Sequence, residues 1–420
     1  MNLFLLSWNY LKAKKLNSVL NVLLMSLGIA VILVLVLLNT QLQENLNKNK
    51  RGIDLVVGAK GSPLQLILAN VYHIDFPTGN VKLNEAKALT RNRLISSAIP
   101  LALGDNYKGF RIVGTNHDYV NLYEGIIAEG QLWKYNLESV IGAKVAERTG
   151  LKVGDTFNGS HGISVADMMH DGDGYVIVGI LESNGSVLDN LILTNVESVW
   201  SVHDHEQEEE SDAEEDVHDH KHEKVIGTAY ATGLPDGDEE DEITSMLIKF
   251  RSPLGAVQLP RYINSNTNMQ AASPAFEIQR LFSLLGIGVD LIQVFAYIII
   301  AISGLSIFIS LFNALKDRKY DLAIMRTLGA SRNKLFLHVI LEGVIITSIG
   351  GLLGMFLGHA LLEGLTLFYD KSEEIGISGL IFAKGEMYVF LYAIIVGIMA
   401  SILPAIIAYR TDISKVLADD

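Results

Sequence analysis

The chain has 420 residues, of which 49% are hydrophobic, and it combines a mean hydropathy of +0.30 with a formal net charge of −14. This composition is too apolar for an ordinary soluble enzyme and too charged for a protein embedded wholly in a bilayer, so it favours a membrane protein with a large soluble part. The chain contains no cysteine, which excludes disulfides from that part and thiolate from any metal site.

Four stretches are long and apolar enough to cross roughly 30 Å of hydrocarbon as helices. The first covers residues 18–40, and its 23 positions carry no charge. It is too long for the apolar region of a signal peptide, and no small-residue cleavage pattern follows it, so we expect a retained helix. The other three predicted spans cover residues 286–315, 336–364 and 386–410.

Basic residues set the expected orientation by the positive-inside rule. Three lysines precede the first span, and the connection at residues 316–335 holds six basic residues against two acids. Both segments are therefore expected in the cytoplasm, whereas the acidic connection at residues 365–385 is expected on the opposite side. Residues 41–285 are then exported, and both ends of the chain, including the tail at residues 411–420, are expected in the cytoplasm.

The exported part alternates β-rich runs with helical stretches. Residues 110–114 and 175–181 are apolar, β-branched and bounded by glycines, a pattern typical of buried strands. Residues 138–157 predict a strand, a helix over residues 143–149, and a glycine-closed turn into a second strand. The sequence therefore predicts a large α+β domain between the first and second of four membrane helices.

Catalytic motifs are not found in the sequence. The run DLVVGAKGS at residues 54–62 has the residue types of a phosphate loop, but its order is Lys-Gly-Ser where a nucleotide site needs Gly-Lys-Ser or Gly-Lys-Thr. It is also expected on the wrong side of the membrane for ATP, and neither HExxH nor GxSxG occurs. We expect no enzyme activity and no intrinsic cofactor in this chain.

The negative charge is local. Two acidic patches, at residues 203–224 and 236–242, account for all of it, so no nucleic-acid partner is expected. The segment at residues 202–224 lies between apolar runs and is interpreted as an insertion in the domain.

Five of the eleven histidines lie in this insertion, among eleven acids. Most recur at every second position, so their side chains would converge on one side of an extended chain. Imidazole and carboxylate together suit zinc, and also nickel or copper(II), so a Zn²⁺ site is one interpretation. A solvated, self-repelling loop has the same composition and is the alternative. The candidate metal ligands are His203, His205, His218, His220 and His222.

The connection after the second span has an amphipathic pattern. Leu322, Met325 and Leu328 fall at near-helical spacing, and basic residues are available for the other face. Gly329 is expected to close this helix, and Ser331 to cap the next one. A plain basic loop attracted to anionic lipid is the alternative. The following span contains GGLLGMFLG, which allows close packing against a neighbouring helix.

These motifs resemble those of a known family, the FtsX-like and MacB-like permeases of ABC transporters, also called type VII or mechanotransmission transporters. The phrase RKYDLAIMRTLGAS, followed by LEG and GGLLG, is similar to the cytoplasmic signature of the family. Residues 1–17 and the first span resemble its cytoplasmic amphipathic N-terminal helix and first membrane helix. The runs VIGAKVAERTGLKVGDTF and YVIVGILESNGSVLDNLILTNVESVW resemble its periplasmic core domain.

The resemblance implies a permease of the bacterial inner membrane that pairs with a second permease, expected to be an identical copy. It also implies a dimer of a separate cytoplasmic ABC ATPase, whose ATP-driven closure is transmitted through the spans to the periplasm. Residues 316–335 would then be the coupling segment. The residues to which the coupling role is carried over are Asp317, Arg318, Lys319, Leu322, Arg326, Leu328 and Gly329.

The leading interpretation links this permease to zinc or another divalent metal, through a periplasmic metal-binding protein or through regulation by the histidine-rich insertion. Lipoprotein release, tripartite efflux and a signalling scaffold that controls a periplasmic partner are the alternatives. Three further features are expected to be structural or remain open. Glu342 is interpreted as a hydrated helix end and His359 as a satisfied interhelical group, while residues 58–79 form a partner surface or a packed internal helix.

Overall fold

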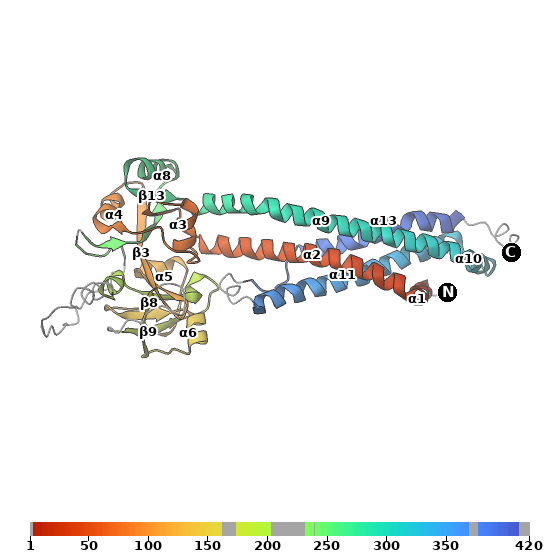
Figure 1. The fold of residues 1–420 in the computed structure, drawn as a ribbon, viewed down its shortest axis with the longest axis horizontal. Helices are drawn as coiled ribbons and strands as arrows, with labels where there is room; N and C mark the ends of the chain where they lie inside the picture. Colours follow the sequence, from red (N-terminus) through yellow and green to blue (C-terminus); the bar gives the residue numbers. More distant parts are fainter. Residues whose placement is uncertain (1–2, 162–173, 203–231, 239, 369–376, 411–420) are drawn as a thin grey trace. The chain divides into compact units, whose positions relative to one another are not determined.

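The computed structural model describes residues 3–161, 174–202, 232–238, 240–368 and 377–410. The chain divides into two compact units, one made of Met1–Gln43 with Leu284–Asp420 and the other of Glu44–Ser283. The first unit is helical and the second is built on a mixed β-sheet (Figure 1).

In the described part of the chain, four helices are long and apolar enough to cross a membrane. They are α2 (Lys15–Asn49), α9 (Pro274–Asp317), α11 (Arg332–Phe368) and α13 (Glu386–Arg410). Two shorter helices, α1 (Leu3–Ala13) and α10 (Lys319–Thr327), precede α2 and α11. Both α2 and α9 extend past the predicted spans into the second unit, because a helix satisfies its own backbone hydrogen bonds in water as well as in hydrocarbon.

The packing of α11 against α2 depends on glycines. A Cβ atom added at Gly354 would lie 2.7 Å from Cβ of Ile29, closer than two carbon atoms approach without a shift. The pattern repeats every four residues, so three glycines of one helix face three side chains of the other, and the close packing expected for GGLLGMFLG is observed. The facing sets are Gly350, Gly354 and Gly358 of α11, and Met25, Ile29 and Leu33 of α2.

The second unit is an α+β domain, and the predicted strands at residues 110–114 and 175–181 and the helix at 143–149 are observed at the same positions. The predicted fold class is therefore confirmed. Its elements are β1 (Leu55–Ala59), α3 (Pro63–Asn70), β2 (Val81–Lys82), α4 (Leu83–Thr90), β3 (Ile95–Tyr107), β4 (Phe110–Gly114), α5 (His117–Leu122), β5 (Ile127–Gly130), β6 (Glu138–Ile141), α6 (Ala143–Thr149), β7 (Thr156–Phe157), β8 (Ser160–His161), β9 (Tyr175–Leu181), η1 (Val187–Asn190), β10 (Leu191–Thr194), β11 (Glu242–Ile243), β12 (Ser245–Phe250), α8 (Leu254–Asn266) and β13 (Met269–Ala272).

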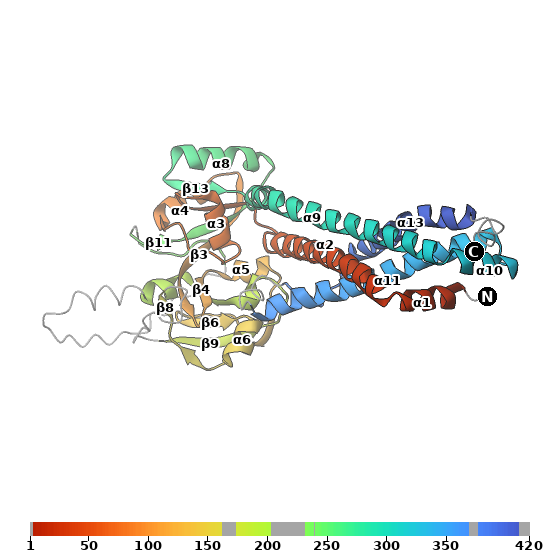
Figure 2. The same cartoon turned by 45° about the vertical axis from the view of Figure 1, so that its right-hand side comes forward.

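The long strand β3 joins two halves of the main sheet, whose order is β13-β1-β12-β3-β4-β10-β6-β9-β5. Residues 95–101 of β3 pair with β12, whereas residues 102–107 pair with β4 or β8. We call β13, β1, β12 and residues 95–101 the first half-sheet, and residues 102–107 with β4, β10, β6, β9 and β5 the second half-sheet. Each half has its own apolar core. Figure 2 shows α4 and α8 beside the first half-sheet and α6 beside the second.

Within residues 58–79, the helix α3 is packed into the domain, while Ile74 and Phe76 after it are exposed. Ser62 caps α3 by accepting a hydrogen bond from the amide of Gln65, and Leu66 and Ile67 are fully buried. Of the two interpretations of this segment, the packed internal helix is therefore the one observed for α3.

A half-buried histidine follows α3. His73 has a left-handed backbone (φ 56°), and its Nε2 lies 2.7 Å from the hydroxyl of Tyr119. Its Nδ1 is enclosed and has no hydrogen-bond partner among the described residues. Burial, assisted by the positive charge of Arg111, lowers the pKa of His73 to about 3. The imidazole is therefore neutral in the folded domain at neutral pH.

This neutral histidine predicts acid-sensitive folding of the domain. Because the pKa of His73 is lower in the folded chain than its ordinary value near 6.5, the unfolded chain binds the proton first. Its contribution to stability is complete above about pH 6.5 and is lost progressively towards pH 3, with a loss of at most about 2 kcal/mol by pH 5. The melting temperature of the detergent-solubilised chain should fall further between pH 7 and pH 5 than that of the His73→Asn variant. Asparagine is the replacement because it tolerates the left-handed backbone. Equal falls in melting temperature for the two chains would contradict a neutral His73 in the folded domain.

Candidate functional site

The short helix α10 presents two different faces. Leu322 and Ala323 are 3% and 0% exposed, and Leu322 anchors the helix in the apolar core of the membrane unit. Tyr320, Ile324 and the C-cap residue Leu328, spaced four residues apart, are 48%, 36% and 82% exposed. Residues at this spacing share one face of a helix, so α10 displays an uncovered apolar stripe beside the exposed residues Lys319 and Asp321.

The end of α10 follows the sequence prediction. Gly329 has a positive φ of 96°, a conformation that costs little for glycine alone, and it turns the chain out of the helix. Ser331 then accepts a hydrogen bond from the amide of Lys334 at 3.4 Å, at the start of α11. The turn fixes where the stripe ends and where α11 begins.

The junction between α9 and α10 is held by a buried ion pair. The side chain of Arg318 is 14% exposed, and its guanidinium donates to Oε1 of Glu342 in α11 at 3.0 Å. It also lies 4.0 Å from the ring centroid of Tyr10 in α1 and donates to the carbonyl of Tyr10 at 3.4 Å. Arg318 therefore faces inward and joins α1, the α9–α10 junction and α11.

Two more polar groups extend this network. Nε2 of His338 lies 3.4 Å from Oε1 of Glu342, one helical turn away, and its Nδ1 lies 2.7 Å from the hydroxyl of Ser7 in α1. Glu342 is 4% exposed. The expectation of a hydrated helix end at Glu342 is therefore wrong, because Arg318 supplies the opposite charge and permits burial of the carboxylate.

A second, exposed ion pair lies beside this junction. Lys14, which precedes α2, contacts Asp317 at the end of α9 at 2.5 Å, and both side chains are accessible to solvent. Exposed pairs contribute little stability, so the buried pair is the stronger restraint on the junction.

His359 is a satisfied interhelical group, as expected. Its Nδ1 lies 2.5 Å from the carbonyl of Gly379 and its Nε2 lies 3.0 Å from Glu386 at the start of α13. These contacts join α11 to α13, so His359 is explained by packing within the membrane unit.

The structure separates the candidate coupling residues into three groups. Asp317, Lys319, Leu328 and Gly329 are exposed, Leu322 and Arg318 face inward, and Arg326 is partly exposed. Sequence reasoning missed Tyr320 and Ile324, although their spacing to Leu328 carried the signal. It also missed Ser7, Tyr10 and His338, for which only the proximity of His338 to Glu342 in the sequence was a hint.

The five candidate metal ligands, His203, His205, His218, His220 and His222, lie outside the described residues. Within the described ranges, no group of three or more histidine, aspartate or glutamate side chains is placed to hold a metal ion.

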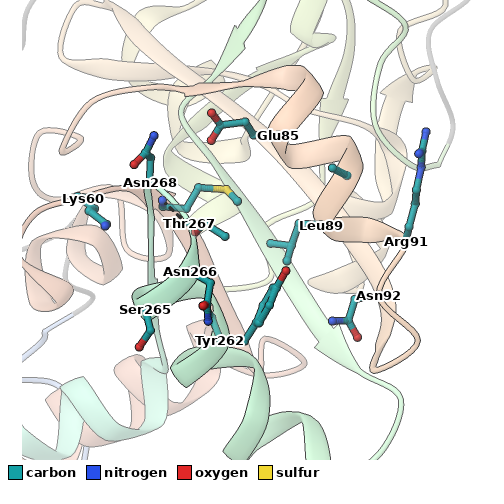
Figure 3. A pocket seen from close by; sticks show the side chains of 12 residues that line it. Lys60, Glu85, Leu89, Arg91, Asn92, Tyr262, Ser265, Asn266, Thr267 and Asn268 are labelled. Atoms are coloured by element: carbon teal, nitrogen blue, oxygen red, sulfur yellow. Dashed lines mark hydrogen bonds between the residues drawn. The ribbon is translucent and has the colours of Figure 1, made fainter.

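A polar cleft of about 810 Å³ lies in the second unit, between α4 and α8 (Figure 3). Lys60, Glu85 and Arg91 contribute charges to its lining, and Tyr262 and the side chains of Asn92, Asn266 and Asn268 contribute hydroxyl and amide groups. This lining offers hydrogen bonds, and among its described residues there is no pairing of a nucleophile with a base.

Four apolar helices, with an α+β domain between the first and second, define a membrane protein with a large domain on one side of the bilayer. A model of the MacB-like periplasmic core domain matches residues 18–247, and a model of the FtsX-like permease C-terminal region matches residues 293–413. The first match covers more than half of the chain. The chain therefore belongs to the family of FtsX-like and MacB-like permeases, and the expected resemblance is confirmed. Four apolar helices and this family fit a protein of the inner membrane.

A curated relative, the uncharacterized ABC transporter permease YvrN of Bacillus subtilis (strain 168), is 29% identical over 94 residues. The match spans 22% of this chain and 22% of that relative, about a fifth of its length. Two solved structures are also similar, each 12% identical. The periplasmic region of MacB from Actinobacillus actinomycetemcomitans is matched over 97% of its length and 56% of this chain, with a TM-score of 0.33. The extracellular domain of the noncanonic ABC-type transporter YknZ from Gram-positive bacteria is matched over 99% of its length and 53% of this chain, with a TM-score of 0.29.

The buried ion pair makes a prediction about stability. The Glu342→Ala variant should lose about 3–5 kcal/mol of unfolding free energy, because Arg318 is left buried without a counter-charge. The double variant Arg318→Met/Glu342→Leu removes both charges and should recover most of that loss. Unfolding of the full chain in mixed micelles measures both, with Lys319→Ala as the exposed control that leaves stability unchanged. A double variant no more stable than Glu342→Ala would contradict the assignment.

Proposed function

We propose that this chain is the permease subunit of an ABC transporter of the bacterial inner membrane, driven by a separate ATPase in the cytoplasm. The observation that carries the proposal is the uncovered apolar stripe of α10, Tyr320, Ile324 and Leu328. A stripe of this kind on a helix whose opposite face is packed is typical of a surface that a partner covers. The basic residues of the same connection support a cytoplasmic location.

The polar network behind α10 would transmit a force on the stripe to other helices. The contacts of Arg318 with Glu342 and Tyr10 hold the α9–α10 junction against α11 and α1. A displacement of α10 by the ATPase would therefore be passed to α9 and α11 together. In this proposal the chain is not itself catalytic, both termini are cytoplasmic, and the functional complex contains two permeases, expected to be identical copies.

Binding of the ATPase to the stripe is testable. Ile324→Asp and Leu328→Asp place charges on the stripe and should abolish co-purification of an ABC ATPase from native membranes, with the ATPase identified by mass spectrometry. The matched control is Leu380→Ala, which changes a leucine of similar exposure in the connection before α13. Ile324→Asp and Leu328→Asp should both keep the wild-type melting temperature, because the stripe is already exposed. Retention of the ATPase by folded Ile324→Asp and Leu328→Asp would leave α10 as a helix on the lipid surface and refute the contact.

A link to zinc or another divalent metal is proposed on sequence grounds. The observation is the density of imidazole and carboxylate groups in residues 202–224. In this proposal the insertion captures metal for a periplasmic metal-binding protein or regulates the permease. Lipoprotein release, tripartite efflux and signalling to a periplasmic partner are the competing roles, and they need no metal.

Zinc titration separates these roles. The purified full chain should bind Zn²⁺ with micromolar or tighter affinity by calorimetry, because several imidazoles in one segment can share an ion. A variant that lacks residues 203–224 should lose this binding while its melting temperature is unchanged. Equal binding by the two chains, or none by either, would exclude the metal link and favour the metal-free roles.

A further inference from the structure

The two half-sheets of the domain are connected differently to the membrane helices. The chain leaves α2 and enters β1, and it leaves β13 and enters α9, so both covalent connections belong to the first half-sheet. The second half-sheet is formed by the part of the chain that runs from residue 102 of β3 to the start of β12. Its attachment to a membrane helix therefore depends on non-covalent contacts.

Such contacts converge on the last two turns of α2. The hydroxyl of Tyr123, which follows α5, donates to the carbonyl of Asn49 at 3.1 Å. The side-chain oxygen of Asn49 accepts a hydrogen bond from the amide of Val187 at 3.1 Å, and Lys48 donates to the carbonyl of Asn184. All three groups bonded to α2 belong to the segment that builds the second half-sheet. The Tyr123 bond also satisfies the backbone carbonyl of Asn49 at the helix end, where intrahelical partners are missing.

The loop that bonds to the end of α2, residues 183–189, is held by hydrogen bonds of its own. Asp189 is 1% exposed, and its carboxylate accepts hydrogen bonds from the amides of Asn184 and Gly185 at 3.0 and 2.9 Å and from the hydroxyl of Ser183 at 2.8 Å. The side chain of Asn184 donates to the carbonyl of Tyr123 at 2.9 Å. The loop at residues 183–189 joins β9 to β10, two neighbours of β6 in the second half-sheet. A force on the loop is therefore delivered to the sheet.

The first half-sheet has its own contact with α2. The hydroxyl of Tyr72, in the segment after α3, donates to the carbonyl of Leu46 at 2.9 Å. This bond lies one turn before Asn49, so loss of the contacts at Lys48 and Asn49 leaves the first half-sheet both covalently and non-covalently attached.

We infer that Lys48 and Asn49 are positioning residues that fix the second half-sheet to α2, so that a displacement of α2 moves the β9–β10 half of the domain. A displacement of α9 acts directly on β13 and the first half-sheet. Movement of α2 relative to α9 would then be converted into movement of one half-sheet relative to the other, about β3. We call the hydrogen bonds of Lys48 and Asn49 with Asn184, Val187 and Tyr123 the clamp. The inference rests on the proposed function for the source of the movement, whereas the clamp is a property of the chain alone.

Spin-label distances in the full chain test the clamp. Because the chain has no cysteine, single cysteines can be introduced at the exposed positions Glu44 in α2, Glu147 in α6 and Gln258 in α8. In the wild-type background, both the 44–147 and the 44–258 distance distributions should be narrow. In the Lys48→Ala/Asn49→Ala/Tyr123→Phe variant, which also removes the hydroxyl that bonds to the backbone carbonyl of Asn49, the 44–147 distribution should broaden about twofold or more. The 44–258 distribution should stay narrow, because the lost bonds free only the second half-sheet.

The matched control is Asn47→Ala, an exposed asparagine on the same turn whose side chain makes no hydrogen bond among the described residues. It should leave both distributions unchanged. The amide of Val187 provides a local readout, since its hydrogen exchange should accelerate about fivefold in Asn49→Ala and not in Asn47→Ala. An unchanged 44–147 distribution in the Lys48→Ala/Asn49→Ala/Tyr123→Phe variant would overturn the clamp.

The same labels separate the clamp from the proposed function. In the complex with its ATPase, ATP should shift both distances in the wild type. The Lys48→Ala/Asn49→Ala/Tyr123→Phe variant should lose the 44–147 shift while keeping the 44–258 shift and the ATPase rate. Absence of any ATP-dependent shift in the wild type would count against the proposed function, while the distributions without ATP would still decide the clamp.

Discussion

The architecture depends on the continuity of one helix. With 35 residues, α2 is about 52 Å long, which exceeds the roughly 30 Å of hydrocarbon that a span must cross. A helix can continue from lipid into water because its backbone hydrogen bonds are internal in both solvents. The same element therefore packs against the glycines of α11 in the membrane unit and ends among Tyr72, Tyr123 and Val187 in the domain.

At the other end of the membrane unit, polar groups restrict how the helices move. Arg318 and Glu342 lie where apolar packing alone would tolerate sliding, and a buried pair is favourable at one relative position of the helices. The ring of Tyr10 and the hydroxyl of Ser7 add α1 to the same network. The consequence is a junction in which polar contacts link α1, α9, α10 and α11, with the exposed stripe of α10 as its accessible surface.

Local patterns predicted much of this fold because their causes are local. The strands at residues 110–114 and 175–181 consist of β-branched apolar residues between glycines, and the turn at Gly329 needs a residue that tolerates a positive φ. No local pattern in the sequence indicated that the side chain of Arg318 faces inward. An arginine on an amphipathic segment faces solvent unless a counter-charge is buried nearby, and Glu342 lies 24 positions away along the chain.

The sequence by itself determined the four spans, the α+β character of the domain and the family, since hydrophobic length, alternation and short motifs are contained in contiguous residues. Only the tertiary structure decided that Glu342 is paired with Arg318, that Tyr320, Ile324 and Leu328 form the exposed face of α10, and that Asn49 bonds to Val187. These facts depend on which distant segments meet, and that is set by the packing of whole helices and half-sheets against one another.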